Sequence, residues 1–271
     1  MHLVATVLVV LLLVLQTVAT PMKRDEKPTG YADPSKVNGG RMLTVVGNNK
    51  GGLGEPLNVI ISNKSDPWVL SECGFTNYSY SLNFRNGEIP KLSFASLQKA
   101  NLGDGYGVRR QKGLQRYGDL AKEVLSGGNH FRWWRQEGKS ANTSAIFIAA
   151  SVEKSKDENH MIVDNGYDLG RDLLVKNATK GTTKDKLGNE YKASVAWDNS
   201  LLKDIKKKDI NHHIGIDGRV AVLTVKVTKD VSTDGKGDPN GGKDKDNAAN
   251  TLAPTAITMI IGLALALVSL I

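Results

Sequence analysis

The sequence predicts one α+β domain, built on a mixed or antiparallel sheet with a few short helices. One observation favours this class, and two others exclude alternatives. Short β-branched runs outnumber helical segments, and the two kinds do not alternate strictly, as they would in a doubly wound sheet. The chain of 271 residues has one cysteine, which excludes an intrachain disulfide framework and a multi-cysteine metal site. No internal apolar stretch reaches the roughly 20 residues of a membrane-spanning helix.

Four runs carry the strand prediction. They cover residues 42–46, 57–61, 145–152 and 220–227. Residues 145–152 (AIFIAASV) are apolar on both faces, which is typical of a central strand. The last run follows the turn Ile216-Asp217-Gly218.

Three segments carry the helix prediction. Asp66-Pro67 provides a cap and a first-turn proline for a short helix that ends at Gly74. Residues 164–179 pair Leu169 with Leu173 before Gly181 and predict a second helix, and residues 117–125 predict a third. Cys73 has apolar neighbours and is expected to be buried.

The N-terminus is typical of a secretory signal peptide. An apolar run covers residues 7–15, and small residues follow up to Ala19 and Thr20, so residues 1–19 are the predicted signal peptide. The dibasic pair Lys23-Arg24 would make residues 20–24 a processed propeptide. The other interpretation is a buried first helix, although nine residues span only about 14 Å and their flanks carry no cap.

The C-terminus is typical of a GPI attachment signal. Small residues surround Asn247, a mildly polar spacer follows, and residues 256–271 are apolar. This pattern predicts lipid attachment at Asn247 and removal of residues 248–271. A retained single-span tail is the alternative, but the apolar stretch is short for a hydrocarbon core of about 30 Å, and no Lys or Arg follows it.

Two polar segments flank the predicted domain. Residues 25–40 contain Pro and Gly without periodicity, which predicts a flexible arm. Residues 230–247 are rich in Gly, Asp and Lys and predict a flexible stalk. The folded domain would therefore cover residues 41–229.

If the chain enters the secretory pathway, its four N-x-S/T sequons can be glycosylated and its net positive charge can be interpreted. Glycosylation is predicted at Asn63, Asn77, Asn142 and Asn177. The net charge of +8 becomes about +6 without Lys23 and Arg24. This excess suits contact with anionic lipid or wall polysaccharide, whereas the secretory route excludes nucleic acid as a partner.

His130 and Arg132 are the first candidate site residues. They follow the turn Gly127-Gly128, and in a strand they would share one face with Trp134, while Phe131 and Trp133 occupy the other. Such a half-buried pair could bind an anionic group or move a proton. Alternatively, this is an ordinary strand in which Arg132 pairs with a carboxylate and both tryptophans fill the core.

Asp168, Arg171 and Asp172 form a second candidate cluster, near the start of the helix predicted over residues 164–179. The two carboxylates stand at i,i+4 and could bind a cation or serve in acid–base chemistry. They could equally cap the helix and form local ion pairs. His160, with His130 and Asp168, could form a metal or hydrolytic site, although the spacing fixes no geometry. We assign no cofactor and no metal.

Several short motifs occur in an order that resembles the LssY-type C-terminal domain. They are LNVIIS (57–62), NHFRWWR (129–135), AIFIAASVE (145–153), His160 with Asp168-x-x-Arg171-Asp172, and DGRVAVL (217–223). GGNHFR and NGYDLGRD are similar to segments of secreted fungal proteins. The resemblance implies one α+β domain and a fungal source. It implies no catalytic role, since the family has no established activity, but it marks His130, Arg132, His160, Asp168, Arg171 and Asp172 for inspection.

These features together predict a GPI-anchored, N-glycosylated protein on the extracellular face of the plasma membrane or in the cell wall. Its role would be that of a binding or structural module. The rival hypothesis is a secreted hydrolase that uses His130, His160 and Asp168 on an anionic ester. That mechanism requires the three side chains to converge, because a general base must lie about 3 Å from the proton that it removes.

Overall fold

A computed structural model of the chain describes residues 30–45, 53–86, 98–119 and 125–231. The predicted signal peptide, propeptide, GPI signal and Asn247 lie outside these residues, as do residues 232–247 of the predicted stalk. No helix of the described part is long and apolar enough to cross a membrane.

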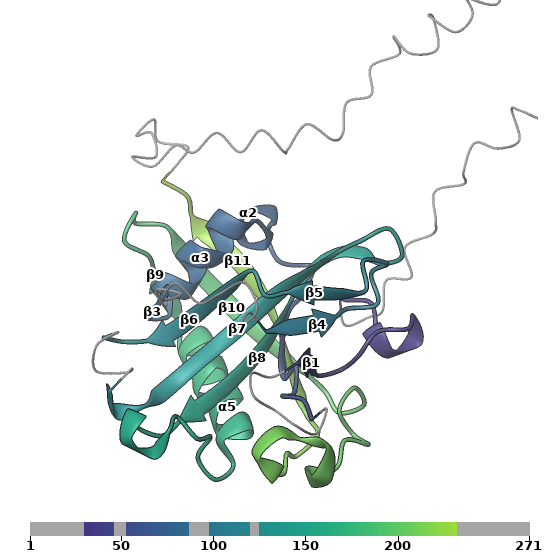
Figure 1. Ribbon diagram of the computed structural model, residues 1–271. Helices are drawn as coiled ribbons and strands as arrows, with labels where there is room; N and C mark the ends of the chain where they lie inside the picture. Colours follow the sequence, from purple (N-terminus) through teal and green to yellow (C-terminus); the bar gives the residue numbers. More distant parts are fainter. Residues whose placement is uncertain (1–29, 46–52, 87–97, 120–124, 232–271) are drawn as a thin grey trace, which may run out of the picture. The chain divides into compact units, whose positions relative to one another are not determined.

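The larger sheet is mixed and, in the part of the chain described, has eight strands (Figure 1). β11 runs parallel to β2, and the other neighbouring pairs are antiparallel. In spatial order the sheet contains β3 (Phe84–Asn86), β6 (Gly113–Tyr117), β7 (Gly128–Glu137), β8 (Asn142–Glu153), β2 (Val59–Ile61), β11 (Val220–Lys229), β10 (Glu190–Asp198) and β9 (Thr182–Lys184).

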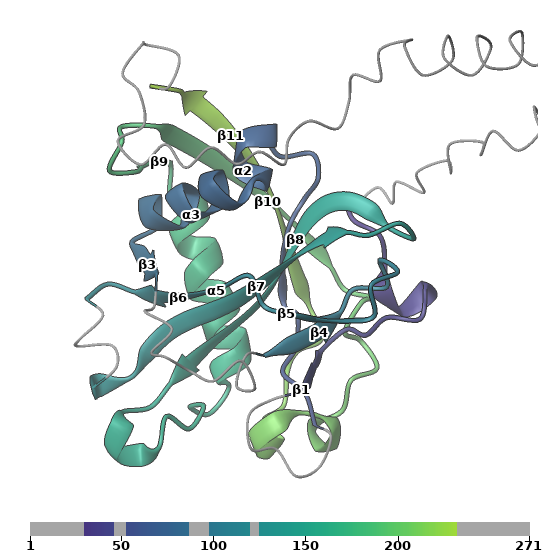
Figure 2. The same ribbon diagram turned by 45° about the horizontal axis from the view of Figure 1, so that its top comes forward.

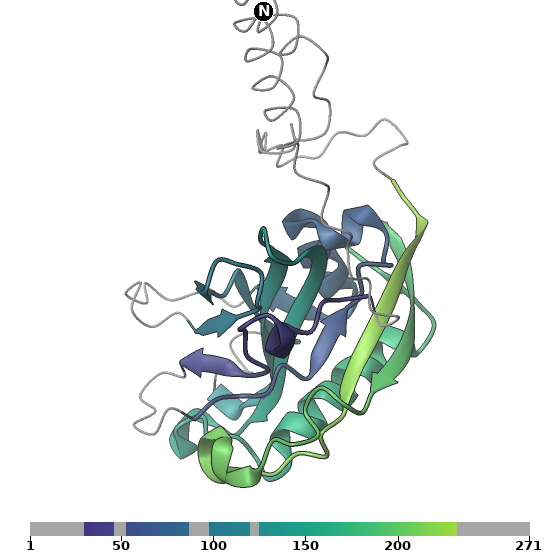
Figure 3. The same ribbon diagram turned by 90° about the vertical axis from the view of Figure 1, so that its right-hand side faces the viewer.

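The two faces of the larger sheet are covered differently (Figures 1, 2 and 3). Helices α2 (Pro67–Leu70), α3 (Glu72–Ser81) and α5 (Gly166–Thr179) contribute to the core on one face. A small antiparallel sheet of β1 (Leu43–Val45), β4 (Lys99–Asn101) and β5 (Val108–Arg110) lies over the other. Short 3-10 turns complete the description: η1 (Pro34–Lys36), η3 (Lys156–Glu158), η4 (Lys207–Asp209) and η5 (Asn211–His213). The predicted α+β class is confirmed, although the fold is mostly sheet.

The alternation predicted for β7 is confirmed by its packing. Phe131 and Trp133 belong to the core beneath α3, where both contact the ring of Phe75. Trp134 belongs to the core on the opposite face and is 1% exposed. The prediction of a central strand is also confirmed, since β8 lies between β7 and β2.

The predicted helix over residues 67–74 is two helices, because Ser71 interrupts it. Ser71 has an extended backbone, and its hydroxyl accepts from the Gly74 N–H and donates to the Trp68 carbonyl. A new helix, α3, therefore begins at Glu72 and turns Cys73 outward. The expectation that Cys73 is buried is wrong: it is exposed, because α3 directs Gly74, Phe75, Tyr78 and Ser79 into the core instead.

The other two helix predictions have different outcomes. The helix predicted over residues 164–179 is α5, which begins two residues later, at Gly166, after a left-handed Asn165. The helix predicted over residues 117–125 is wrong at its start, because Tyr117 ends strand β6 and pairs with Phe84. Residues 120–124 lie outside the described residues.

The flexible arm predicted over residues 25–40 is wrong from residue 30 onward. Tyr31 is fully buried, packs edge-to-face on Phe147 and donates a hydrogen bond to the Asp198 carboxylate. The Ala32 backbone is bonded in both directions to the Gln136 amide, at 3.0 Å each way. Tyr31 is a single aromatic residue within a polar stretch, so the composition of the segment does not indicate that it is anchored. The described fold therefore includes Tyr31, and its last strand, β11, ends at Lys229.

Replacing Tyr31 by Phe should destabilise the domain, because it deletes the hydroxyl that contacts buried Asp198 and keeps the ring. Burial raises the pKa of Asp198, but hydrogen bonds from Ser200 and Tyr31 bring it below its ordinary value. A lost hydrogen bond to a charged acceptor costs about 1.5–3 kcal/mol. Urea unfolding should therefore show a lower midpoint at an unchanged slope.

Tyr106→Phe is the matched control, since the Tyr106 side chain is 61% exposed. Its free energy of unfolding should change by less than about 0.5 kcal/mol. Equal midpoints for Tyr31→Phe and the unmodified protein would contradict the role of Tyr31 as an anchor.

Candidate functional site

β7 and β8 bring His130 into a polar cluster beneath the surface. His130 is fully buried. Its Nε2 lies 3.1 Å from Arg132 Nη1, 3.3 Å from Ser151 Oγ and 3.3 Å from Glu153 Oε1. Antiparallel pairing sets this geometry, because His130 stands opposite Ser151 and the next inward position on β8 is Glu153.

Glu153 is the site residue that sequence reasoning missed. It joins both predicted histidines, since its Oε2 lies 3.5 Å from His160 Nδ1 while Oε1 contacts His130. Arg116 Nη1 also lies 3.8 Å from Oε2. The alternation of side chains along a strand could have identified Glu153, because this residue ends the apolar strand and lies on the same face as Ser151. It is the only carboxylate within the AIFIAASVE segment.

A tight loop returns His160 to Glu153. The Lys154 N–H donates to the Met161 carbonyl, and Asn159 and His160 both adopt left-handed backbone conformations, at φ +55° and +52°. Ile162 then pairs with Glu153 as an isolated bridge. The His160 side chain remains 33% exposed, so it is the most accessible member of the His130–Glu153–His160 group.

His130 is held neutral. Burial lowers its pKa well below the ordinary value, and the charges of Arg132, Arg116 and His160 lower it further. The Arg132 guanidinium can only donate to Nε2, whereas the Glu153 carboxylate can only accept from it, so the two contacts favour opposite tautomers of His130. Nδ1 faces the backbone of Gly128, but the geometry falls short of a hydrogen bond.

The charges of this cluster are matched in pairs. Arg132 Nη1 lies 3.6 Å from Glu55 Oε2, and the side chains are 15% and 6% exposed. Burial raises the pKa of Tyr167, as do the nearby Glu55 and Glu153, so its hydroxyl stays protonated and donates to the Asn211 carbonyl. With Arg116 beside Glu153, two cations face two carboxylates. Among these described residues, no cation is left unpaired for an anionic group. Arg132 pairs with a carboxylate, as expected if β7 is an ordinary structural strand.

Ser151, His130 and Glu153 do not form a catalytic triad. In a triad the carboxylate holds the histidine nitrogen opposite the one that activates the nucleophile. Here the Ser151 hydroxyl and the Glu153 carboxylate approach the same nitrogen, Nε2. Ser151 is moreover 1% exposed, so its hydroxyl is closed to substrate. The contact stabilises the β7–β8 pair instead.

Asp168, Arg171 and Asp172 lie in a different cluster. Arg171 is 1% exposed, and its guanidinium donates to Asp168 Oδ1 at 3.2 Å, Asp172 Oδ1 at 2.8 Å and both oxygens of Asp217 at 2.6 and 2.8 Å. It also lies 5.2 Å from the Trp197 ring centre. In the described part of the chain, no hydrogen bond or ion pair joins Asp168 to His130 or His160. The hydrogen bonds that the hydrolase hypothesis requires between Asp168 and the two histidines are therefore missing from the described residues.

The Arg171 cluster fastens α5 to the loop that precedes β11. Burial raises the pKa of Asp168, and the attraction of Arg171 only partly offsets this. Burial also raises the pKa of Asp217, but hydrogen bonds from Arg171 and the Arg219 backbone bring it below its ordinary value. The Asp217 N–H in turn donates to Asp168 Oδ2 at 2.9 Å. The ion-pair part of the structural interpretation is therefore confirmed, whereas the residue before α5 is Asn165, whose side chain forms no capping hydrogen bond.

No group of three or more His, Cys, Asp or Glu side chains that could hold a metal ion occurs among the described residues. No protein-family model matches the chain, and neither a curated protein nor a solved structure matches it. The resemblance to the LssY-type domain therefore stays a prediction, carried by the sequence motifs alone.

His130 should make the stability of the domain sensitive to acid. Below pH about 6.5 the unfolded chain binds a proton at this residue that the folded chain does not, so the free energy of unfolding falls as the pH is lowered. One such group contributes up to about 1.4 kcal/mol per pH unit. Urea unfolding between pH 7.5 and 5 should therefore show a shallower decline for His130→Gln than for the unmodified protein.

Trp134→Phe is the control for this series, because it alters the same strand and removes no titrating group. Its curve should run parallel to that of the unmodified protein at every pH. Equal slopes for His130→Gln and Trp134→Phe would contradict a neutral buried His130.

Arg171→Met should destabilise the domain strongly, because it leaves Asp168 and Asp217 without their cation. Breaking a buried ion pair by removing one partner costs about 3–5 kcal/mol. Lys176→Met on the exposed side of the same helix is the control and should cost less than about 0.5 kcal/mol. Similar unfolding midpoints for the two variants would show that Arg171 does not fasten α5.

Proposed function

We propose that this protein is a GPI-anchored, N-glycosylated cell-surface protein that acts as a binding module without catalytic activity. One observation carries the non-catalytic part. Among the candidate catalytic side chains, His130, Ser151 and Arg171 are each 1% exposed or less and are engaged by neighbouring polar groups, and His160, which is 33% exposed, contacts Glu153. They support the fold and leave little surface for a substrate.

The ends of the sequence carry the proposed location. The apolar run over residues 7–15 would send the chain into the secretory pathway, and the small residues around Asn247 with the apolar tail would exchange the C-terminus for a GPI lipid. The stalk of residues 230–247 would then separate the domain from the extracellular face of the plasma membrane, or lead it into the cell wall.

The exposure of the sequons supports glycosylation, most clearly at Asn142. This residue is exposed at the start of β8, immediately after the β7–β8 turn. Asn63, Asn77 and Asn177 are partly buried, and the last two lie within α3 and α5. A glycan on Asn142 would extend into solvent without disturbing the core.

The proposed partners are a wall polysaccharide or an anionic lipid surface, and not nucleic acid. The basic excess of about +6 on the processed chain would favour an anionic surface by long-range attraction. The domain itself would be of the LssY type, as its motif order suggests.

A secreted hydrolase is the second candidate, favoured by the 3.3 Å contact between Ser151 Oγ and His130 Nε2. Such an enzyme would lose its turnover on replacement of Ser151 by Ala. The burial of both residues and the shared nitrogen weigh against it.

Phosphatidylinositol-specific phospholipase C tests the anchor directly. We expect the enzyme to release the tagged protein from membranes of expressing cells into the soluble fraction. In Leu265→Arg a charge interrupts the apolar tail that the attachment signal requires. This variant should receive no GPI lipid, so the enzyme should release none of it from membranes. Protein that stays membrane-bound after treatment, with its C-terminal tail still detectable, would contradict the anchor.

A further inference from the structure

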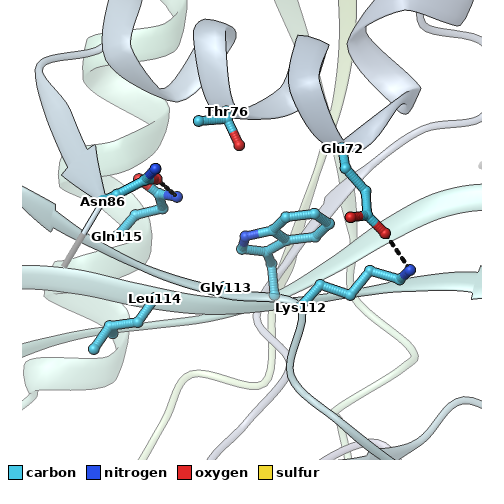
Figure 4. A pocket seen from close by; sticks show the side chains of 8 residues that line it. Glu72, Thr76, Asn86, Lys112, Gly113, Leu114 and Gln115 are labelled. Atoms are coloured by element: carbon cyan, nitrogen blue, oxygen red, sulfur yellow. Dashed lines mark hydrogen bonds and ion pairs between the residues drawn. The ribbon is translucent and has the colours of Figure 1, made fainter. Parts of the chain in front are cut away.

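A pocket opens on the helical side of the larger sheet, between α3, the end of β3 and the edge of β6 (Figure 4). Its volume is about 230 Å³. The Thr76 side chain projects from α3 into this space, between an Asn86–Gln115 pair on one side and a Glu72–Lys112 pair on the other. The lining residues are Glu72, Thr76, Asn86, Lys112, Gly113, Leu114, Gln115 and Trp133.

Two buried polar atoms in the wall of this pocket have no hydrogen-bond partner among the described residues. They are Trp133 Nε1, a donor, and Gln115 Oε1, an acceptor. Both side chains are 2% exposed. The other end of the Gln115 amide is fixed, because Nε2 donates to Asn86 Oδ1 at 2.7 Å. Buried polar groups are nearly always satisfied by protein or water, so this donor and this acceptor are groups to which a polar ligand entering the pocket can bond.

Gly113 gives the indole room at this position. It stands opposite Trp133 in the β6–β7 pair, and a Cβ added there would lie 2.3 Å from Trp133 Nε1. Any other residue would force the indole to move. The glycine thus leaves the N–H group at the wall of the pocket.

The charges beside the pocket are already paired. Lys112 bonds to Glu72 and lies 3.0 Å from Glu137. Burial raises the pKa of Glu137, but hydrogen bonds from Arg109, Lys112 and Arg135 outweigh it and lower the pKa to about 2. The Lys112 ammonium therefore faces the ionised Glu137 carboxylate throughout the physiological range and also contacts Glu72, so the pocket favours a neutral ligand over a phosphate or carboxylate.

We infer that this pocket binds one neutral hexopyranose unit of a surface or wall polysaccharide. A sugar hydroxyl both donates and accepts, so neighbouring hydroxyls can accept from Trp133 Nε1 and donate to Gln115 Oε1. Thr76 adds a further hydroxyl partner. The volume is below the roughly 300–1,000 Å³ of pockets for drug-sized ligands, which fits a single ring. The inference rests on the proposed function and names the ligand class of that binding module.

Indole N–H resonances test the inference at atomic resolution. The full chain, labelled at its four tryptophans and kept in a sugar-free detergent, is titrated with methyl β-glucopyranoside and methyl α-mannopyranoside. The Trp133 signal is assigned by its loss in Trp133→Phe. We expect one glycoside to shift this signal saturably and to leave the Trp134 signal in place, because Trp134 Nε1 already donates to the Arg109 carbonyl on the other face.

Calorimetry on matched variants tests the individual groups. Trp133→Phe should weaken glycoside binding about tenfold, because it removes the donor and keeps an aromatic ring. Thr76→Val, at a partly exposed helix position, should weaken it severalfold without affecting folding. Trp134→Phe is the control and should bind as the unmodified protein does. Equal affinities for Trp133→Phe and Trp134→Phe, or a Trp133 signal unmoved by either glycoside, would overturn the inference. A stronger shift with inorganic phosphate would also overturn it, since the pocket would then prefer an anion to a neutral sugar.

Sedimentation with insoluble wall polysaccharide separates this inference from the proposed function. If the unmodified protein and Trp133→Phe sediment equally while the glycosides leave Trp133 unmoved, the protein is a surface binding module and the pocket is not its sugar site. If the glycoside shifts Trp133 but no polymer or anionic vesicle retains the protein, the pocket binds a sugar and the proposed surface role is wrong.

Discussion

The buried guanidinium of Arg171 is the interaction on which the placement of α5 depends. A charge removed from water costs several kcal/mol unless partners surround it, so carboxylates must approach from both sides. Asp168 does so from the same helix and Asp217 from the loop before β11. Because β11 forms the parallel pair with β2, this bidentate contact also sets the helix against the centre of the larger sheet.

The same constraint explains why the candidate catalytic residues pair with one another. Histidine, arginine and carboxylate side chains suit catalysis because they carry charge, and for that reason they also need partners when a sheet buries them. His130 meets the constraint by staying neutral, whereas Arg132 meets it with Glu55. A linear sequence shows the residue types but not their partners, so it could not separate a catalytic cluster from a structural one.

Features that depend on neighbouring residues could be predicted from the sequence, whereas contacts between residues distant in the chain could not. The alternation of β7 and the apolar run of β8 are local, and both are correct. Tyr31 and Glu153 were missed because their roles depend on Asp198, distant in the chain, and on the β7–β8 register. The motif order grouped His160 with Asp168, but the loop after β8 turns His160 back to Glu153 while α5 directs Asp168 towards Asp217.

The two adjacent tryptophans of β7 show how differently the faces of the sheet use the same residue. Trp134 Nε1 donates to the Arg109 carbonyl, so this indole has its partner within the fold. Trp133 Nε1 has no such partner among the described residues and lies beside Gly113 in the pocket wall. An unsatisfied buried donor costs about 1–3 kcal/mol, and phenylalanine at position 133 would avoid that cost while filling similar space. This cost is consistent with our proposal that a ligand bonds to the indole N–H in the pocket.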